Sequence, residues 1–557
     1  MTNYAKMLRA NQREPLFGRE DDMVKNAAGG YAFKVNPNTA LERFLILGCE
    51  GGTYYVGQRG MAKSAAGLVL ACAKTNPNLT IETIVQISQA GRAIKPDPSI
   101  FALALLAGAK GPEYTVARRL ALEAMPIVCR TGTQLFQFVS QVTEFRGWGR
   151  GLRKAVSKWY TSKTPRDVLY QSSKYQAREG WTHRDVLRCA HPNDPSMNPV
   201  FRYITKGDYT DEVVQMGLDD RDLAYIGAIE TAKKTTDERM IIRLIREQNL
   251  VREHIPTNWL NSPAVWDALL AKMPLMAMVR NLGKMSNVGL LAPMSEAAKT
   301  ICKRLRDTEY IRRGRMHPFG LLLAQTTYSA GRGFRGNLTW TTVPQVVDAL
   351  QDAFYGAFEY VEPTGKNFLL GVDISGSMGF RGFNHMGLIN NTHIKAYQAA
   401  ACMALVQMQT EEWCYPVAFS GAPMRSYMRN PRSYNGDGVV PMSGFSKCKR
   451  LDDAVEEMKQ YPAGGTNCAL PMLYAAKNKL PVDTFVIYTD NETWCGDIHP
   501  SKALETYRQT MSRDAKLIVC AMTATNYSIA DPSDPGMLDI VGFDASCPKI
   551  ITEFVRD

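Results

Sequence analysis

Three oxygen-bearing side chains follow a short apolar run in the last third of this chain. The run extends from Phe368 to Val372, and Asp373-Ile-Ser375-Gly-Ser377 comes directly after it. An apolar run of this length predicts a buried strand, and open parallel sheets bind their ligands at the carboxyl ends of such strands. One carboxylate and two hydroxyls at that edge are ligands that a hard metal ion prefers.

A second strand and a turn supply further ligands. The apolar run Thr484 to Tyr488 ends in Thr489-Asp490-Asn491-Glu492, and the turn Gly464-Gly465-Thr466 presents one more hydroxyl. This order of residues resembles the metal-ion-dependent adhesion site of von Willebrand factor A domains. The alternative is that the first carboxylate and the serines only cap a following helix. We predict a site for Mg²⁺ or Mn²⁺, completed by water, with the ligands Asp373, Ser375, Ser377, Thr466 and Asp490.

This pattern favours binding over catalysis. Phosphatases of the D-x-D type need a second carboxylate two residues after the nucleophile, and Ser375 occupies that position. The sequence has no G-x-S-x-G nucleophile elbow, and Asn367 stands after Gly365-Lys366 where a phosphate-binding loop has a hydroxyl residue. We therefore expect no catalytic residue and a protein that is not an enzyme.

The positive charge of the chain is confined to its first part. At 557 residues and 45% hydrophobic, the chain is long enough to form more than one domain. Residues 1–365 carry 48 basic and 34 acidic residues, whereas residues 366–557 carry 18 and 20. A single-sign excess over one domain is an expected footprint of nucleic-acid binding, with solubility as the alternative explanation.

The sequence predicts a cytoplasmic, soluble protein. The twelve cysteines lack paired spacing, and several lie in apolar stretches, which is typical of reduced core thiols. Met1 to Lys25 is polar and lacks the apolar segment of a signal peptide. No stretch reaches the roughly 18 apolar residues of a membrane span.

Two domains follow a short leader in the predicted organisation. Residues 1–29 are expected to be loosely ordered. Residues 30–365 show one helical pattern after another, which favours an α-solenoid over an irregular helical domain. Residues 366–557 alternate strand and helix and predict a doubly wound α/β domain. Its strands are expected near 368–372, 414–419, 484–488 and 516–522, and its helices near 393–410, 450–460, 469–479 and 500–512.

Cations interleaved with aromatic residues form a second candidate site. A helix begins at Thr164, and we expect it to carry Lys174 and Arg178, four residues apart, on one face. His191 ends the next predicted helix. Upstream, residues 146–160 combine five arginines and lysines with Trp148, Trp159 and Tyr160. Cations reach phosphates and aromatics stack on unpaired bases, but a solvated helix face over core tryptophans explains the same pattern.

Several segments together resemble one known family from about Gly30 to the carboxyl terminus. The resemblance is to the Ro 60-kDa ribonucleoprotein family, in which a TROVE domain precedes a von Willebrand A domain. The segments that carry it are Gly48 to Tyr55, Trp148-Gly149-Arg150, Leu250 to His254, Arg280 to Met285, His317-Pro318-Phe319, Val361 to Lys366 and Thr489 to Thr493.

This resemblance implies a monomeric ring of HEAT-like helical repeats that is closed by the A domain. The implied ligands are small Y RNAs on the outer surface and single-stranded ends of misfolded noncoding RNAs in the central hole, with a role in RNA quality control. It maps the Y RNA contacts onto Lys174, Arg178 and His191. An exoribonuclease is an implied partner, whereas DNA is not expected.

Two departures from the family and two rival functions stay open at this point. Residues 379–393 and 421–449 are longer than the usual loops of this family, and Asn467 follows Thr466 where an acid is common. One rival is an intracellular adaptor whose metal captures a partner carboxylate. The other is a magnesium nuclease. The excess of +14 in the first part argues against the adaptor, and the lack of a paired-carboxylate site argues against the nuclease.

Overall fold

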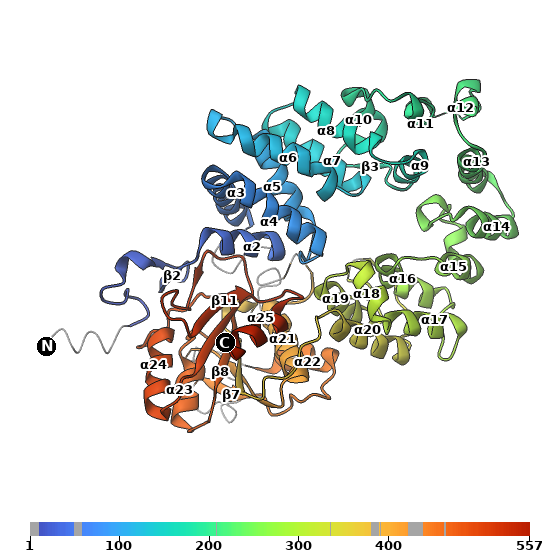
Figure 1. Ribbon diagram of the computed structural model, residues 1–557. Helices are drawn as coiled ribbons and strands as arrows, with labels where there is room; N and C mark the ends of the chain where they lie inside the picture. Colours follow the sequence, from blue (N-terminus) through green and yellow to red (C-terminus); the bar gives the residue numbers. More distant parts are fainter. Residues whose placement is uncertain are drawn as a thin grey trace.

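Helices dominate the first two thirds of the protein. The computed structural model describes residues 11–49, 58–207, 209–334, 336–379, 389, 392–421, 438–461 and 464–557. Residues 37–356 form a curved succession of helices, here called the helical arc (Figure 1). Its helices are α2 (Pro37–Leu47), α3 (Gln58–Thr75), α4 (Pro77–Ala90), α5 (Asp97–Gly108), α6 (Thr115–Val128), α7 (Gly132–Phe145), α8 (Arg150–Thr161), α9 (Pro165–Lys174), α10 (His183–Ala190), α11 (Asn198–Lys206), α12 (Glu212–Gly217), α13 (Asp220–Lys234), α14 (Glu238–Gln248), α15 (Pro263–Leu270), α16 (Leu275–Asn287), α17 (Glu296–Leu305), α18 (Thr308–Gly314), α19 (Pro318–Ser329) and α20 (Pro344–Gly356).

The helix starts follow local capping chemistry. Thr164 accepts a hydrogen bond from the backbone N–H of Asp167, and Thr182 forms a reciprocal capping box with Asp185. Ser262 caps α15 in the same way, before a proline at the first helical position. Because these hydroxyls satisfy the first free N–H groups of the next helix, the helical pattern predicted for residues 30–365 is confirmed at these junctions.

The last third forms a sheet domain over residues 367–557. In its described part, six strands lie in the order β11-β9-β8-β5-β6-β7, all parallel except the edge strand β7. The predicted doubly wound α/β fold is confirmed, and all four predicted strands are present. The elements are β5 (Asn367–Asp373), α21 (Ala396–Thr410), β6 (Trp413–Phe419), β7 (Val439–Pro441), α22 (Leu451–Glu457), α23 (Leu470–Lys477), β8 (Thr484–Thr489), α24 (Pro500–Met511), β9 (Lys516–Ala521), β11 (Met537–Val541) and α25 (Cys547–Arg556).

The two faces of the sheet belong to different hydrophobic cores. Leu369 packs with α23 and α24 on one face. Phe368, Leu370 and Val372 point to the other face, where α21, α22 and α25 lie, and this second core continues into the helical arc. Alternation along β5 therefore joins the sheet domain and the arc through one shared apolar interior.

The first end of the helical arc is anchored on the sheet domain by buried charge. Arg43 of α2 is fully buried and forms an ion pair with Asp539 of β11. Its guanidinium also donates to the carbonyl oxygens of Thr525 and Tyr527, at 2.9 and 3.0 Å. Arg92, which follows α4, pairs with Asp544 at 2.6 Å. Such pairs fix geometry, because an unpaired buried charge would be costly.

The other end of the arc returns to the same domain. Arg450, just before α22, pairs with Asp348 of α20 at 2.6 Å, and the backbone N–H of Leu451 donates to Gln351. The rings of Phe319 and Phe543 pack edge to face, 5.5 Å apart. Figure 1 shows the arc leaving the sheet domain at α2 and returning at α19 and α20. The chain therefore closes into a ring of helices completed by the sheet domain.

Residues 11–34 form an ordered segment on the sheet domain, here called the amino-terminal strap. It contains η1 (Glu20–Asp22), β1 (Met23–Lys25) and β2 (Tyr31–Lys34), and β2 pairs with β10 (Tyr527–Ser528). The prediction of a loosely ordered leader is wrong for residues 11–29, because strand pairing and buried polar contacts hold them. In the part of the chain that the structure describes, no helix combines the length and apolar composition needed to cross a bilayer.

Candidate functional sites

The predicted metal ligands meet at the carboxyl edge of the sheet. Strands β5 and β8 are parallel neighbours, with Val372 opposite Tyr488, so the residues that follow them emerge side by side. The turn that carries Thr466 reaches the same edge, since the backbone N–H of Gly376 donates to Gly464 at 3.1 Å. All five predicted ligands are at most 3% exposed.

Hydrogen bonds orient the first carboxylate and the serines. Asp373 accepts from the backbone N–H of Ser375 at 2.8 Å and from the hydroxyl of Thr489 at 2.6 Å. The hydroxyls of Ser375 and Ser377 lie 3.0 Å apart. Thr489 was not among the predicted site residues, although its position at the end of a strand was the available signal.

The second carboxylate has an unmatched oxygen. Asp490 accepts from the backbone N–H of Glu492 through Oδ1, but its buried Oδ2 has no hydrogen-bond partner among the described residues. Burial raises the pKa of Asp490 well above its usual range, and the negative charges of Asp373 and Glu492 raise it further. Burial also raises the pKa of Asp373. Buried carboxylates of this kind are costly unless a cation offsets them.

The donor set fits a small hard cation. Two carboxylates and three hydroxyls supply only oxygen, as Mg²⁺ and Mn²⁺ prefer. A cation near Asp490 Oδ2 would satisfy the unmatched oxygen and neutralise the paired charge. These side chains, Asp373, Ser375, Ser377, Thr466 and Asp490, could therefore hold a divalent metal with water in the remaining positions.

The strap buttresses both loops of this site. Gln12 is fully buried, donates to Asn467 at 2.8 Å and accepts from Thr493 at 2.6 Å. Asn26 donates to the carbonyl oxygen of Thr493 at 2.7 Å. Asn467, which stands where the related A domains often have an acid, thus accepts a hydrogen bond from the strap. Most of the long loops predicted at 379–393 and 421–449 lies outside the described residues.

The second candidate site has a different geometry from the prediction. Helix α9 ends at Lys174, and Arg178 lies in a two-residue strand, β3 (Ala177–Arg178), paired with β4 (Trp181–Thr182). The prediction that both cations share a helix face is wrong. A tight hairpin turn intervenes, with positive φ at Glu179 and Gly180.

The three predicted side chains border consecutive elements and form what we call the basic strip. Lys174 lies near the rings of Tyr170 and Tyr175 and donates to the Tyr170 hydroxyl at 2.8 Å. Arg178 is 55% exposed, and its contact with Glu179 is a surface ion pair. His191 is exposed at the end of α10, in a left-handed conformation. Since eight helical residues span about 12 Å, the strip is an extended surface rather than a single pocket.

The aromatic residues of α8 are core residues. Trp159 and Tyr160 are fully buried, and the Tyr160 hydroxyl bonds to His183 Nδ1 at 2.7 Å. These two rings are therefore not available for stacking on a base. This agrees with the alternative explanation, a solvated helix face over core aromatic residues. The cations of the same helix point outward: Arg150, Arg153, Lys154 and Lys158 are exposed and form no ion pair with another described residue.

A third feature was missed by the sequence analysis, and we call it the junction cavity. It has a volume of about 630 Å³ and draws its walls from the α4–α5 connection, α16, α19 and the sheet domain. Apolar groups such as Phe319 and Trp340 line it together with four cations, Lys95, Arg252, Arg280 and Lys284. Its residues are up to roughly 300 positions apart in the chain, so no local pattern could reveal it.

Comparison with known proteins agrees with this architecture. Residues 24–330 match the TROVE domain, and residues 367–555 match the Ro60 vWA domain. The chain belongs to the Ro60 family. Within the Ro60 family it is 36% identical to an RNA-binding protein RO60 of Caenorhabditis elegans over 96% of this chain and 90% of the relative. It is 35% identical to the RNA-binding protein RO60 of Deinococcus radiodurans over 100% and 99%.

A solved Ro60 family structure shares the fold. The crystal structure of the Deinococcus radiodurans RO (RSR) protein is similar with a TM-score of 0.67 at 35% identity, covering 94% of this chain and 99% of that one. The two matched domains correspond to most of the helical arc with part of the strap and to the sheet domain, on either side of the boundary predicted at residue 365.

Proposed function

We propose that this chain is a non-enzymatic RNA-binding ring protein acting in RNA quality control. Its ligands are small Y or Y-like RNAs and the single-stranded ends of misfolded noncoding RNAs. The observation that carries the proposal is the basic strip, in which Arg178 and His191 are exposed and Lys174 is partly exposed, in a chain whose relatives are named RNA-binding proteins. We place its action in the cytoplasm, with an exoribonuclease as a further partner.

The shape of the basic strip suits a folded RNA. Lys174 ends α9, Arg178 lies in β3 and His191 follows α10, so the three side chains are spread over consecutive elements. Exposed cations reach phosphates without reading sequence. The further exposed cations of α8 extend the positive surface of the arc. Such a surface supplies affinity that depends strongly on salt.

The junction cavity supports the proposed binding of single-stranded ends. Unpaired bases stack on aromatic or apolar groups, while cations follow the backbone. Trp340 is partly exposed and offers the first kind of contact, and Arg280 and Lys284 offer the second. An A-form duplex is too wide for such a cavity, so a single strand is the form of RNA that fits it.

We further propose Mg²⁺ or Mn²⁺ at the sheet-domain site. When bound, the metal would neutralise the two carboxylates. Hydrogen bonds from Ser375 and Thr489 hold Asp373 in place, and the backbone N–H of Glu492 orients Asp490. The second candidate function, a metal-dependent adaptor, is favoured by the unmatched Oδ2 of Asp490, which also suits a site that shares its metal with a partner carboxylate.

The non-enzymatic proposal predicts that RNA stays intact. Both oxygens of Asp373 accept hydrogen bonds, and the donor set is almost fully buried, so none of these groups is an exposed nucleophile or general acid. End-labelled RNA incubated with the purified protein and Mg²⁺ should keep its length. Shortening that depends on time and disappears in Asp373→Ala would favour the nuclease instead.

The RNA that copurifies with the protein tests the main proposal. Sequencing should find small structured RNAs enriched with the wild type and depleted with Lys174→Ala and Arg178→Ala combined. Equal, unselective recovery with both proteins would contradict an RNA ligand for the basic strip.

A further inference from the structure

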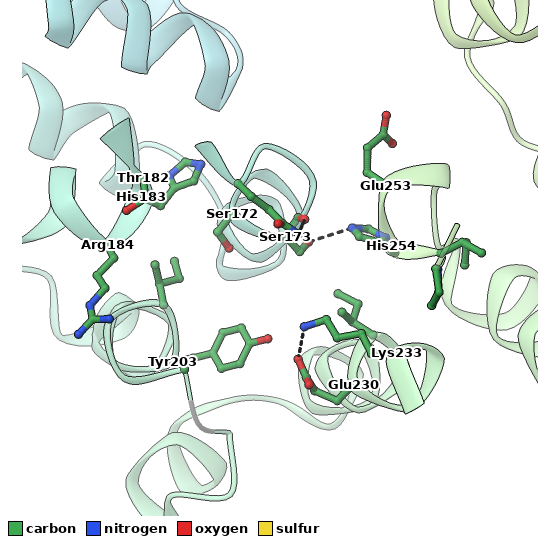
Figure 2. A pocket seen from close by; sticks show the side chains of 16 residues that line it. Ser172, Ser173, Thr182, His183, Arg184, Tyr203, Glu230, Lys233, Glu253 and His254 are labelled. Carbon is green, nitrogen blue, oxygen red and sulfur yellow. Dashed lines mark hydrogen bonds and ion pairs between the residues drawn. The ribbon is translucent and has the colours of Figure 1, made fainter. Parts of the chain in front are cut away.

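A second cavity lies among the elements that carry the basic strip. It has a volume of about 480 Å³ and is walled by the end of α9, the β4–α10 start, α11, α13 and η4 (Arg252–His254). Figure 2 shows side chains from these elements converging on one space. Helix α9 and the β3–β4 hairpin, which contribute to these walls, also carry Lys174 and Arg178, so the cavity and those cations belong to the same elements.

Hydroxyl and amide groups make up much of the cavity wall. Ser173 bonds to His254 Nε2 at 3.1 Å, and the amide of Gln176 donates to the carbonyl oxygen of Ser173 at 3.3 Å. Tyr203 extends its ring across the space with its hydroxyl towards the Glu230–Lys233 ion pair (Figure 2). A planar aromatic side and several polar groups together suit a flat, polar ligand.

The charge in the cavity is balanced. Arg184 and Lys233 line it together with Glu230 and Glu253. Its two histidines are neutral, because burial lowers the pKa of His183 to about 3 and that of His254 to about 4. A phosphate group gains little from such a lining, since two carboxylates offset the two cations. Among the described residues, Lys174 of the strip has no carboxylate partner, whereas Arg178 pairs with Glu179.

We infer that this cavity receives an unpaired base of the structured RNA whose backbone lies on the basic strip. The inference rests on the proposed function and adds to it a site that reads the RNA. Sequence-specific recognition of RNA targets bases that are splayed out of a helix at bulges and loops, because the grooves of A-form RNA are hard to read. A base entering here leaves its own phosphates beside Lys174 and Arg178.

The ion pair in the cavity predicts which base is preferred. Glu230 and Lys233 lie 2.7 Å apart and present an acceptor next to a donor. The Watson–Crick edge of guanine offers two adjacent N–H donors to a carboxylate and one carbonyl oxygen to an ammonium group. Guanine therefore matches both partners at once, and Tyr203 lies where it can contact the ring.

Labelled RNA hairpins test the inference. One set carries a single bulged guanosine that is moved step by step along one strand, and a matched set carries an abasic nucleotide at the same positions. For the best-bound position, the wild type should bind the guanosine hairpin about tenfold more tightly than the abasic one, the size of one good base contact. In Glu230→Gln this preference should fall to about twofold, with an unchanged slope of affinity against salt.

A control variant distinguishes the loss of a contact in the cavity from the loss of any surface ion pair. Glu247→Gln breaks a comparable surface pair, with Arg243 at 3.0 Å on α14, outside the cavity, and should behave as wild type. Equal binding of the guanosine and abasic hairpins at every position, or a full preference in Glu230→Gln, would overturn the inference alone. Failure of the wild type to bind any hairpin, bulged or not, would overturn the proposed function as well.

Discussion

The buried Oδ2 of Asp490 is the atom that most favours a cation at the candidate metal site. A carboxylate oxygen that is fully buried without a partner among the described residues costs free energy, and the neighbouring Asp373 adds repulsion. A divalent cation removes both costs. The candidate ligands could be predicted because each follows a strand or a glycine turn, whereas the bond from Thr489 to Asp373 required the register of two strands.

Loss of Asp373 should abolish metal binding. Asp373→Ala removes one of two anionic ligands, so calorimetric titration with Mg²⁺ or Mn²⁺ should show no binding, while RNA affinity stays nearly the same. Asp373→Asn, which keeps the shape of the side chain, should also lose the metal if charge is the cause. Asp514→Ala, at a carboxylate that is 99% exposed, is the control. Equal metal binding by the wild type and both Asp373 variants would refute the site.

Contacts of Lys174 and Arg178 with RNA should appear in the salt dependence of the RNA affinity. Lys174→Ala with Arg178→Ala should weaken binding of a structured RNA and make the slope of log K against log salt shallower by up to about two, because fewer counterions are released. Lys299→Ala with Arg312→Ala removes the same net charge from paired residues elsewhere on the arc. If both double variants change the slope equally, the strip has no special role.

At the scale of elements, the sheet domain was the most predictable part. Its four predicted strands are apolar runs of five to seven residues bounded by polar residues, and each appears within about two residues of the predicted position. The edge strands β7 and β11 were not predicted. Each is short and only partly apolar, and its pairing depends on a neighbour that is distant in sequence.

The hairpin β3–β4 shows where spacing misled the sequence analysis. Lys174 and Arg178 are four residues apart, but this spacing places them on one face only if the helix continues. It ends at Lys174, and the turn has Glu179 in the left-handed conformation where asparagine or aspartate is usual. The common sequence signal of a hairpin is therefore missing.

The strap is the element whose role the sequence concealed. Its short strands are individually unstable, and they are ordered by contacts with residues more than 450 positions away, such as Gln12 with Asn467 and Asn26 with Thr493. These partners adjoin Thr466 and Asp490. The strap therefore holds the two loops of the metal site in register.

A methyl group at Gly30 should loosen the strap and the metal site together. A Cβ there would lie 1.9 Å from the carbonyl oxygen of Thr493, so Gly30→Ala must displace the backbone and should cost about 1–3 kcal/mol of stability. Thermal unfolding and Mg²⁺ titration measure the two effects. Gly67→Ala in α3, where a Cβ meets no atom within 4 Å, is the control. Unchanged stability and metal affinity in Gly30→Ala would contradict the role of the strap.

At the scale of the whole molecule, ring closure depends on contacts that no local pattern encodes. Arg43 pairs with Asp539, and Asp348 with Arg450, so both ends of the helical arc are fixed on one sheet domain. The sequence predicted helices and a solenoid, but only the resemblance to a known family implied a ring. Under the proposed function, the ring offers RNA two candidate surfaces, the basic strip and the junction cavity.

The most direct test of this account compares tailed and blunt RNAs. Filter binding at several salt concentrations should show that a hairpin with a single-stranded 3′ tail binds more tightly than the same hairpin with a blunt end, and that a Y-like RNA competes with it. Lys174→Ala with Arg178→Ala should lower the affinity for the blunt hairpin. The gain in affinity that the tail provides should change less. If removal of the tail changes nothing and the double variant binds like the wild type, the strip is only a solvated surface and the adaptor function is the better explanation.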